Sequence, residues 1–218
     1  MTGKHPFTAP LVRENPLTLN VLGVCAALAI TNSLTNSLVM SAALTTVLIL
    51  SNATISLVRK LLPSSVRLIV QITVIASAVT VIDQFLKAYL PDAAAKLTVY
   101  ISLIITNCIV LGRAEGCAMK EGVGTSVLDA LGNGLGYSII LVTVATVREL
   151  LGKGTLMGYT VLPLAQDGGW YHENALVMLA PSAFFIIGIL VWAVRTWRPE
   201  QSEEPDFEPM PLPKKEKR

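Results

Sequence analysis

The sequence predicts an all-α integral membrane protein with six transmembrane helices in a 3+3 inverted repeat, of which the first and fourth helices are short or broken. Three observations favour this fold class. Hydrophobic residues make up 52% of the 218 residues and charged residues only 15%, whereas soluble domains carry about 25% charged residues. The apolar residues are gathered into runs that do not alternate as barrel strands would. Two of the runs, at matching positions in the two halves, are short. A freestanding soluble enzyme is excluded.

Six apolar runs account for the predicted helices, since backbone groups in lipid must bond within their own segment. A hydrocarbon core roughly 30 Å thick needs about 20 helical residues to cross it. The predicted helices are Leu17–Ile30, Leu38–Val58, Val66–Leu90, Leu97–Gly112, Ser126–Leu151 and Ala175–Trp197. Pro181 lies inside the sixth run and should kink it. The runs define one transmembrane domain, residues 17–197.

The segments outside this domain are predicted to be cytoplasmic. Residues 1–16 contain charged residues and three prolines, which does not fit a cleavable signal peptide. Residues 198–218 are rich in proline and charge, so this tail is expected to be disordered. Of the 17 lysines and arginines, 13 fall on the side that holds both termini. The excess of positive charge predicts that this side is cytoplasmic. The opposite side holds Lys87, Lys96, Arg148 and Lys153.

The inverted repeat is predicted from the two short runs and from a weak internal echo. Leu17–Ile30 and Leu97–Gly112 are the first members of two three-helix halves. The second run closes with Val58-Arg-Lys-Leu-Leu62 and the fifth with Val147-Arg-Glu-Leu-Leu151. Because each half has an odd number of helices, the second half is inverted. Short spans at matched positions of such repeats point to a site near the middle of the membrane.

Each short run carries one cysteine, and this pair is the candidate metal site. Cys25 follows Arg13 by twelve residues and Cys108 follows Lys96 by twelve. Twelve helical residues rise about 18 Å, which brings both thiols near the bilayer centre from opposite sides. A [2Fe–2S] cluster needs four cysteine ligands, so a homologous neighbour would have to supply two more. The cluster's negative charge requires compensation, which helix N-termini can give. Packing alone also explains both cysteines.

Cys117 breaks this symmetry, since it lies in the charged segment after the fourth run, and it is interpreted as incidental. In the same segment, Arg113 and Glu115 are interpreted as a solvated pair that fixes topology, or as a cytoplasmic rim near the cluster. Arg148 and Glu149 are interpreted as an anchor at the exit of the fifth helix. The closely spaced glycines from Gly132 to Gly136 favour tight helix packing.

Two carboxylates near or within the runs are candidates for a Na+ pathway, because ionisable residues in a membrane are functional by default. Asp129 lies early in the fifth run, with Asn133 one turn later on the same face. Asp83 lies near the end of the third run, where Lys87 could instead pair with it.

Four segments resemble the NqrDE/RnfAE family of membrane redox-pump subunits, over roughly residues 10–201. They are LGVCAALAIT (Leu22–Thr31), SLIITNCIVLGRAE (Ser102–Glu115), LDALGNGLGY (Leu128–Tyr137) and LAPSAFFIIGILVWAVRTWRPEQ (Leu179–Gln201). The ITNC…GRAE motif marks the family. The last segment favours the branch found in the Na+-translocating NADH:quinone reductase over the Rnf branch. The chain departs from the family at Cys117 and in its long tail.

The resemblance implies a multi-pass protein of the bacterial inner membrane that is one subunit of a translocase, without a complete active site of its own. It implies that Cys25 and Cys108 ligate the iron of a [2Fe–2S] cluster shared with the homologous E subunit. The A, B, C and F subunits would complete the complex, with NADH, FAD, FMN and ubiquinone on those other subunits. Electrons would cross the membrane between the FAD-containing subunit and the periplasmic flavin of the C subunit, coupled to Na+ export.

Two alternatives stay open. The chain could be the equivalent subunit of the Rnf ferredoxin:NAD+ oxidoreductase, or a non-redox membrane transporter or assembly protein whose cysteines only pack. Nothing in the sequence favours nucleic-acid binding.

Overall fold

The computed structural model describes residues 17, 21–61, 63, 66–89, 100, 102–157, 159, 160, 172 and 175–197. The predicted N-terminal segment and tail lie outside these residues, and Leu17 belongs to the predicted first helix. Three of the described helices are long and apolar enough to cross a membrane, namely Leu34–Leu61, Arg67–Tyr89 and Val123–Lys153, and Pro181–Trp197 is a shorter apolar helix. The described part of the chain is therefore mostly helical and suited to a membrane.

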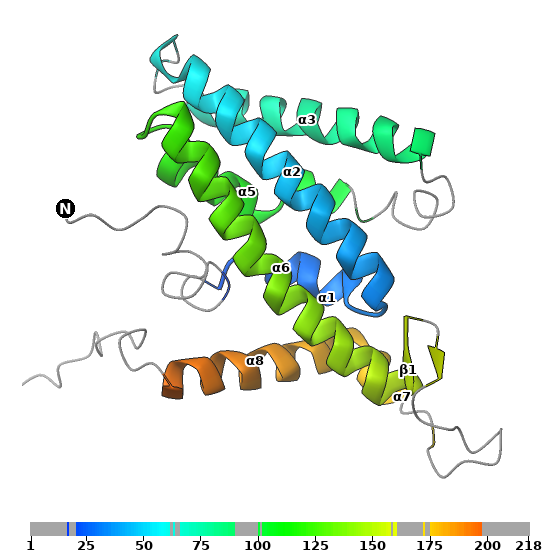
Figure 1. The fold of residues 1–218 in the computed structure, drawn as a ribbon. Helices are drawn as coiled ribbons and strands as arrows, with labels where there is room; N and C mark the ends of the chain where they lie inside the picture. Colours follow the sequence, from blue (N-terminus) through cyan, green and yellow to red (C-terminus); the bar gives the residue numbers. More distant parts are fainter. Residues whose placement is uncertain are drawn as a thin grey trace, which may run out of the picture.

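The centre of the fold is an antiparallel pair of long helices, α2 (Leu34–Val58) and α6 (Val123–Lys153) (Figure 1). Apolar residues of both helices belong to one core cluster. A Cβ atom added to Gly134 would lie 2.7 Å from Thr45 Cγ2, so the glycine allows the two helices to approach. This contact confirms, for Gly134, the prediction that the glycine cluster serves helix packing.

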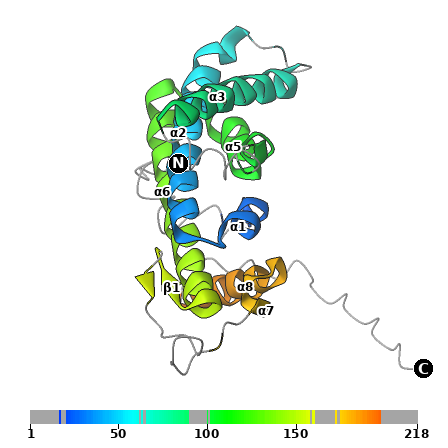
Figure 2. The ribbon, with the colours of Figure 1, turned by 90° about the vertical axis from the view of Figure 1, so that its right-hand side faces the viewer.

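The remaining elements surround this pair. They are α1 (Val24–Ile30), η2 (Arg59–Leu61), α3 (Arg67–Tyr89), α5 (Cys108–Arg113), the π-helical turn η3 (Ala114–Ala118), β1 (Thr155–Leu156), β2 (Tyr159–Thr160), α7 (Ala175–Met178) and α8 (Ala180–Trp197). The two strands pair antiparallel in a small hairpin. α3 covers one end of the central pair and α8 the other, while α1 and α5 lie on one side between them (Figure 2). α1 packs against α8, and α5 packs against α3.

The two short runs are broken, as predicted, but not where the hydropathy pattern placed their ends. In the first run only Val24–Ile30 is α-helical, after a turn in which Gly23 has φ +84°. In the fourth run the helix is interrupted at Thr106 and Asn107 and then restarts at Cys108. It continues past Gly112 into η3, so the charged segment predicted to be a solvated loop is a helical turn.

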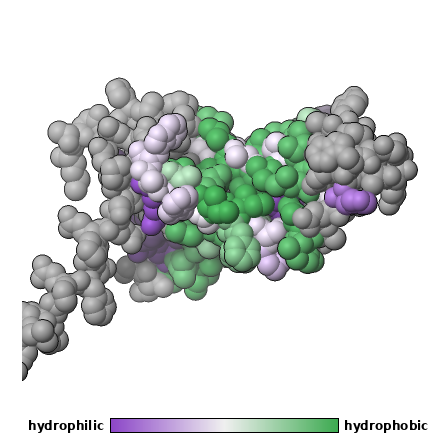
Figure 3. Space-filling view, turned by 90° about the horizontal axis from the view of Figure 1, so that it is seen from below, coloured by the Kyte–Doolittle hydropathy of each residue, from purple (hydrophilic) through white to green (hydrophobic). Residues whose placement is uncertain are grey.

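The sixth run is divided into α7 and α8, with a bend at Leu179 two residues before Pro181. The predicted kink is thus a break, because proline lacks the N–H that would continue the preceding helix. Several of the large side chains of α8 point outwards, Phe185 and Trp192 among them. Seen from the α8 side, hydrophobic residues form a broad band across the middle of the molecule (Figure 3). Such a surface suits lipid or a partner protein.

Candidate cofactor-ligand site

The structure brings together the two cysteines that the sequence analysis singled out. Cys25 is the second residue of α1 and Cys108 is the first residue of α5. Their side chains lie close enough to interact with each other, although 82 residues separate them in the sequence. Both cysteines are exposed in the isolated chain. The pair therefore forms an open patch of two thiols rather than a closed site.

Gly23 sets the position of Cys25. It lies just before α1 in the left-handed region, with φ +84° and ψ 10°, which other residues rarely adopt. A Cβ atom at this position would lie 2.6 Å from Ile109 Cδ1 of α5. Its carbonyl oxygen accepts a hydrogen bond of 3.2 Å from the hydroxyl of Tyr137 on α6. Gly23 thus lets the first turns of α1 and α5 meet while α6 holds the entry to α1.

Asn107 sets the position of Cys108. Its backbone is extended, with φ −72° and ψ 125°, so the chain changes direction before α5 begins. Its side-chain oxygen accepts a hydrogen bond of 3.1 Å from the N–H of Ile109 and so caps the helix. Asn107 is fully buried, and its Nδ2 atom has no hydrogen-bond partner among the described residues. The Asn107 amide is thus a buried donor without a partner among the described residues, next to Cys108 in the sequence.

A cavity of about 610 Å³ opens beside Cys108. It lies between α3 and α5 and is lined by Arg67, Leu68, Thr106, Cys108, Leu111, Gly112 and Glu115. Arg67 and Glu115 form an ion pair of 2.5 Å across it, and Gln71 Nε2 donates to Glu115 Oε2 at 2.8 Å. Glu115 is therefore bound to α3, and the interpretation of Arg113 and Glu115 as a pair in solvent is wrong.

Arg113 pairs instead with Asp129. Its Nε donates to Asp129 Oδ2 at 2.9 Å, and a second bond joins the other guanidinium arm to Oδ1. Asp129 is nearly buried, with 5% exposed surface. Asn133 Nδ2 donates to the backbone oxygen of Asp129 at 2.8 Å, and Asn133 Oδ1 is buried without a partner among the described residues. The Asp129 carboxylate is thus neutralised by an arginine, and Asn133 does not contact it through its side chain.

Asp83 belongs to a different part of the molecule. It lies on α3 and forms an ion pair of 2.6 Å with Lys87, one turn later. The i,i+4 pairing that the sequence suggested is confirmed. The described contacts therefore join Asp129 and Asn133 but leave Asp83 apart from them.

Cys117 is buried in η3, with 7% exposed surface. Its thiol lies near Ser126, Asp129 and Arg113. Burial and the nearby Asp129 carboxylate together raise the pKa of the Cys117 thiol. Cys117 therefore belongs to the packing between η3 and α6 and not to the exposed thiol pair.

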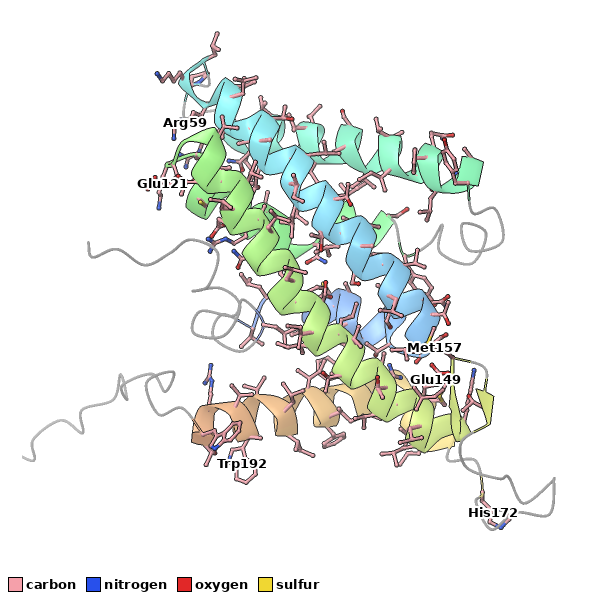
Figure 4. The ribbon with its side chains drawn as sticks, viewed as in Figure 1. Arg59, Glu121, Glu149, Met157, His172 and Trp192 are labelled. Atoms are coloured by element: carbon pink, nitrogen blue, oxygen red, sulfur yellow. The ribbon has the colours of Figure 1, made fainter. Side chains whose placement is uncertain are left out.

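Arg148 and Glu149, interpreted from the sequence as an anchor at the exit of the fifth helix, do not point into solvent. Both side chains are buried, and Glu149 Oε2 accepts a hydrogen bond from the N–H of Leu34, the first residue of α2. At the other end of the central pair, Arg59 and Ser56 both donate to the carbonyl oxygen of Glu121. Figure 4 shows Arg59 beside Glu121 at one end and Glu149 at the other. The similarity of the segments VRKLL and VRELL was the only sequence signal for the contacts at the two ends of the helix pair.

No group of three or more histidine, cysteine or acidic side chains converges on one point within the described ranges. The thiol pair therefore offers two ligands from this chain. Two thiolates suit half of a four-cysteine iron–sulfur site, and their exposure leaves room for ligands from another chain.

Comparison with known proteins identifies the family. Residues 4–191 match the family model described as Rnf-Nqr subunit, membrane protein. A protein of Neisseria meningitidis serogroup B is 54% identical over 201 residues, which is 92% of this chain and 97% of the relative. A Neisseria gonorrhoeae protein is 53% identical over the same shares of both chains. A Psychromonas ingrahamii protein is 53% identical over 200 residues, which is 92% of this chain and 95% of that protein. All three are named as the D subunit of Na(+)-translocating NADH-quinone reductase. The chain therefore belongs to the Rnf-Nqr family of membrane-protein subunits.

Proposed function

We propose that the chain is the D subunit of a Na+-translocating NADH:quinone reductase in a bacterial inner membrane, and that Cys25 and Cys108 supply half of the ligands of a [2Fe–2S] cluster shared with the homologous E subunit. The observation that carries the proposal is that two exposed thiols from separate helices lie close together. The names of the relatives support the choice of complex.

The exposure of the thiols supports a site shared between two chains. A cysteine that only packs is normally buried, as Cys117 is here. Cys25 and Cys108 instead stand in the first turns of two separate helices, are both exposed and lie near each other. A homologous partner with a similar patch would bring the number of thiolates to four, the number that a [2Fe–2S] cluster requires.

The surroundings suit such a group. Asn107 holds a free buried donor next to Cys108, and hydrogen bonds to cluster sulfur stabilise its negative charge. Gly23 keeps side-chain atoms away from the contact between α1 and α5. When bound, the cluster would supply one-electron transfer. The role of this chain is then to hold two thiolates at fixed positions and to exclude water on its own side.

The inverted repeat is part of the proposal, and the packing supports it. α1 packs against α8 of the other half, and α5 packs against α3. Arg59, directly after α2, donates to Glu121 in the segment before α6. Glu149, near the end of α6, accepts from the N–H of Leu34 at the start of α2. The two halves therefore make reciprocal contacts. In this arrangement both termini are cytoplasmic, and α1 and α5 approach the membrane centre from opposite sides.

We further propose that Na+ export involves Asp129 and Asn133, with a lesser part for Asp83. Oxygen atoms of carboxylates and amides suit a hard cation. Because Arg113 occupies the Asp129 carboxylate in this structure, Na+ would bind there only after the arginine has moved away. Likewise, Na+ would bind the Asp83 carboxylate only after Lys87 has moved away from it.

The test of the cluster site uses three cysteine variants of the complete complex. We expect Cys25→Ser and Cys108→Ser each to abolish the EPR signal of the reduced cluster and to lower iron and acid-labile sulfide by about two atoms of each per complex, the content of one such cluster. Cys117→Ser is the matched control and should retain both. Unchanged iron in the Cys25→Ser complex would reject the proposal and favour packing.

A further inference from the structure

Arg148 is a fully buried cation whose side chain donates hydrogen bonds to five oxygen atoms. They are Leu28 O at 3.3 Å, Thr31 Oγ1 at 2.6 Å, Val177 O at 3.3 Å, Met178 O at 2.8 Å and Leu179 O at 3.1 Å. None of these acceptors is a carboxylate. The geometry uses what distinguishes arginine, namely five N–H donors spread over a planar fork.

The acceptors lie at the C-terminal ends of two short helices. Leu28 and Thr31 belong to the last turn and the cap of α1, and the other three belong to the end of α7 and the bend after it. The last carbonyl groups of a helix have no partner within the helix. Burying such groups without a partner is unfavourable, so Arg148 satisfies both helix ends at once.

Helix α1 needs this support because it has only seven residues, too few to be stable by itself. Gly23 and Tyr137 hold its beginning, and Arg148 holds its end. The neighbouring Glu149 binds the N–H of Leu34, so two successive residues of α6 fix the turn between α1 and α2 from both sides. Cys25 lies one turn before Leu28 on this same short element.

We propose that Arg148 is a positioning residue for Cys25. By holding the end of α1 against the end of α7, it fixes where the Cys25 thiol stands relative to Cys108. This inference rests on the proposed function for its consequence, cluster binding, but the position of the thiol can be measured without a cluster. The rate at which Cys25 and Cys108 can be joined as a disulfide reports their relative position.

The experiment compares variants at Arg148 in the assembled complex, on a Cys117→Ser background. Iron is removed with a chelator and ferricyanide, and the thiols are reduced again. Copper phenanthroline then oxidises the pair, so that two S–H bonds break, one S–S bond forms, and two protons and two electrons leave, the electrons passing to Cu(II). Mass spectrometry follows the linked peptide. Iron content and the EPR spectrum of the untreated complex are measured alongside.

We expect Arg148→Gln to slow the linkage about tenfold, since several hydrogen bonds from a charged donor are lost, and to lower the iron content with it. Arg148→Lys should show an intermediate rate, because its three donors on one nitrogen atom cannot reach both helix ends. Arg59→Gln is the matched control at the corresponding end of α2, where the arginine binds Glu121 and not α1. It should link at the unmodified rate.

If the Arg148→Gln complex does not assemble, a second pair of variants tests the positioning role. Thr31→Val removes the acceptor of the shortest Arg148 bond, and Thr46→Val removes a threonine of α2 whose hydroxyl donates within its own helix. Thr31→Val should slow the linkage about threefold, and Thr46→Val should leave it unchanged. Equal linkage rates in the Arg148 or Thr31 variants and their controls would overturn the inference. If the unmodified complex lacked the iron of this cluster but the Arg148 variants still linked more slowly, the cluster would be rejected and the positioning role supported.

Discussion

Helix α1 begins at a glycine in the left-handed region, whereas α5 begins at an extended asparagine that caps the helix with its own side chain. The beginning of α1 is held by a hydrogen bond from Tyr137 of another helix, but that of α5 is held locally. Both arrangements place a cysteine in the first turn of the helix, near the other cysteine. Two helix starts that each carry a cysteine in the first turn are thus built from unrelated local chemistry.

The largest effect is expected from Gly23→Ala, which tests how the start of α1 is fixed. Alanine at the left-handed φ of +84° is unfavourable by roughly 1–2 kcal/mol, and its Cβ would also meet Ile109 at 2.6 Å. We expect most of the iron to be lost and the complex to unfold at a lower temperature, as measured by iron analysis and by thermal scanning in detergent.

Gly116→Ala is the control for this substitution, because a Cβ atom at Gly116 meets nothing within 4 Å. Its iron content and melting temperature should equal those of the unmodified complex. If the two variants behaved alike, the strain at Gly23 would not be what fixes α1.

Asn107→Ala tests the α5 side and should have a smaller effect. Loss of the side-chain cap is expected to destabilise the helix start by about 1 kcal/mol. We expect a shifted or broadened EPR signal from the proposed cluster, with partial loss of iron. Asn107→Ser restores a capping oxygen and should recover the iron content. A serine variant no better than alanine would mean that the amide matters for another reason, such as its free Nδ2 donor.

The smallest effect is expected from Tyr137→Phe, which removes only the hydroxyl bound to the Gly23 carbonyl. That carbonyl also accepts a hydrogen bond from the N–H of Ala27, so it does not lose its last partner. We expect a loss of about 1 kcal/mol or less in thermal stability and normal iron content. A loss of iron as large as that of Gly23→Ala would show that the hydrogen bond from α6 contributes as much to the position of α1 as the glycine does.

Hydropathy alone predicted much of the fold. The long helices α2, α3 and α6 begin and end within a few residues of the predicted runs, because apolar length is what a membrane selects. The break before Pro181 followed from the missing N–H of proline. Hydropathy did not place the interruption at Asn107, since a buried side-chain cap and a residue of an apolar helix look alike in such a pattern.

The buried charges were harder to predict. Arg148 stands at the end of an apolar run, and a cation there normally indicates an exit from the membrane. Its acceptors on α1 lie more than 110 residues away in the sequence, so only the assembled fold identifies them. Asp129 was recognised as a candidate, but its pairing with Arg113 depends on the turn that η3 makes. The cysteine pair could be singled out because both members stood at the same distance from the last preceding cation.

The length of α6 has a consequence for where the charges sit. Asp129 and Arg148 are 19 residues apart on this continuous helix, a rise of about 28 Å. This is close to the thickness of a bilayer's hydrocarbon core, roughly 30 Å. If α6 crosses the membrane perpendicular to its plane, the two buried charges lie at the two boundaries of the hydrocarbon core. In that orientation each charge would lie near water and lipid headgroups, which would lower its desolvation cost. The stretch between the two residues carries no charged side chain.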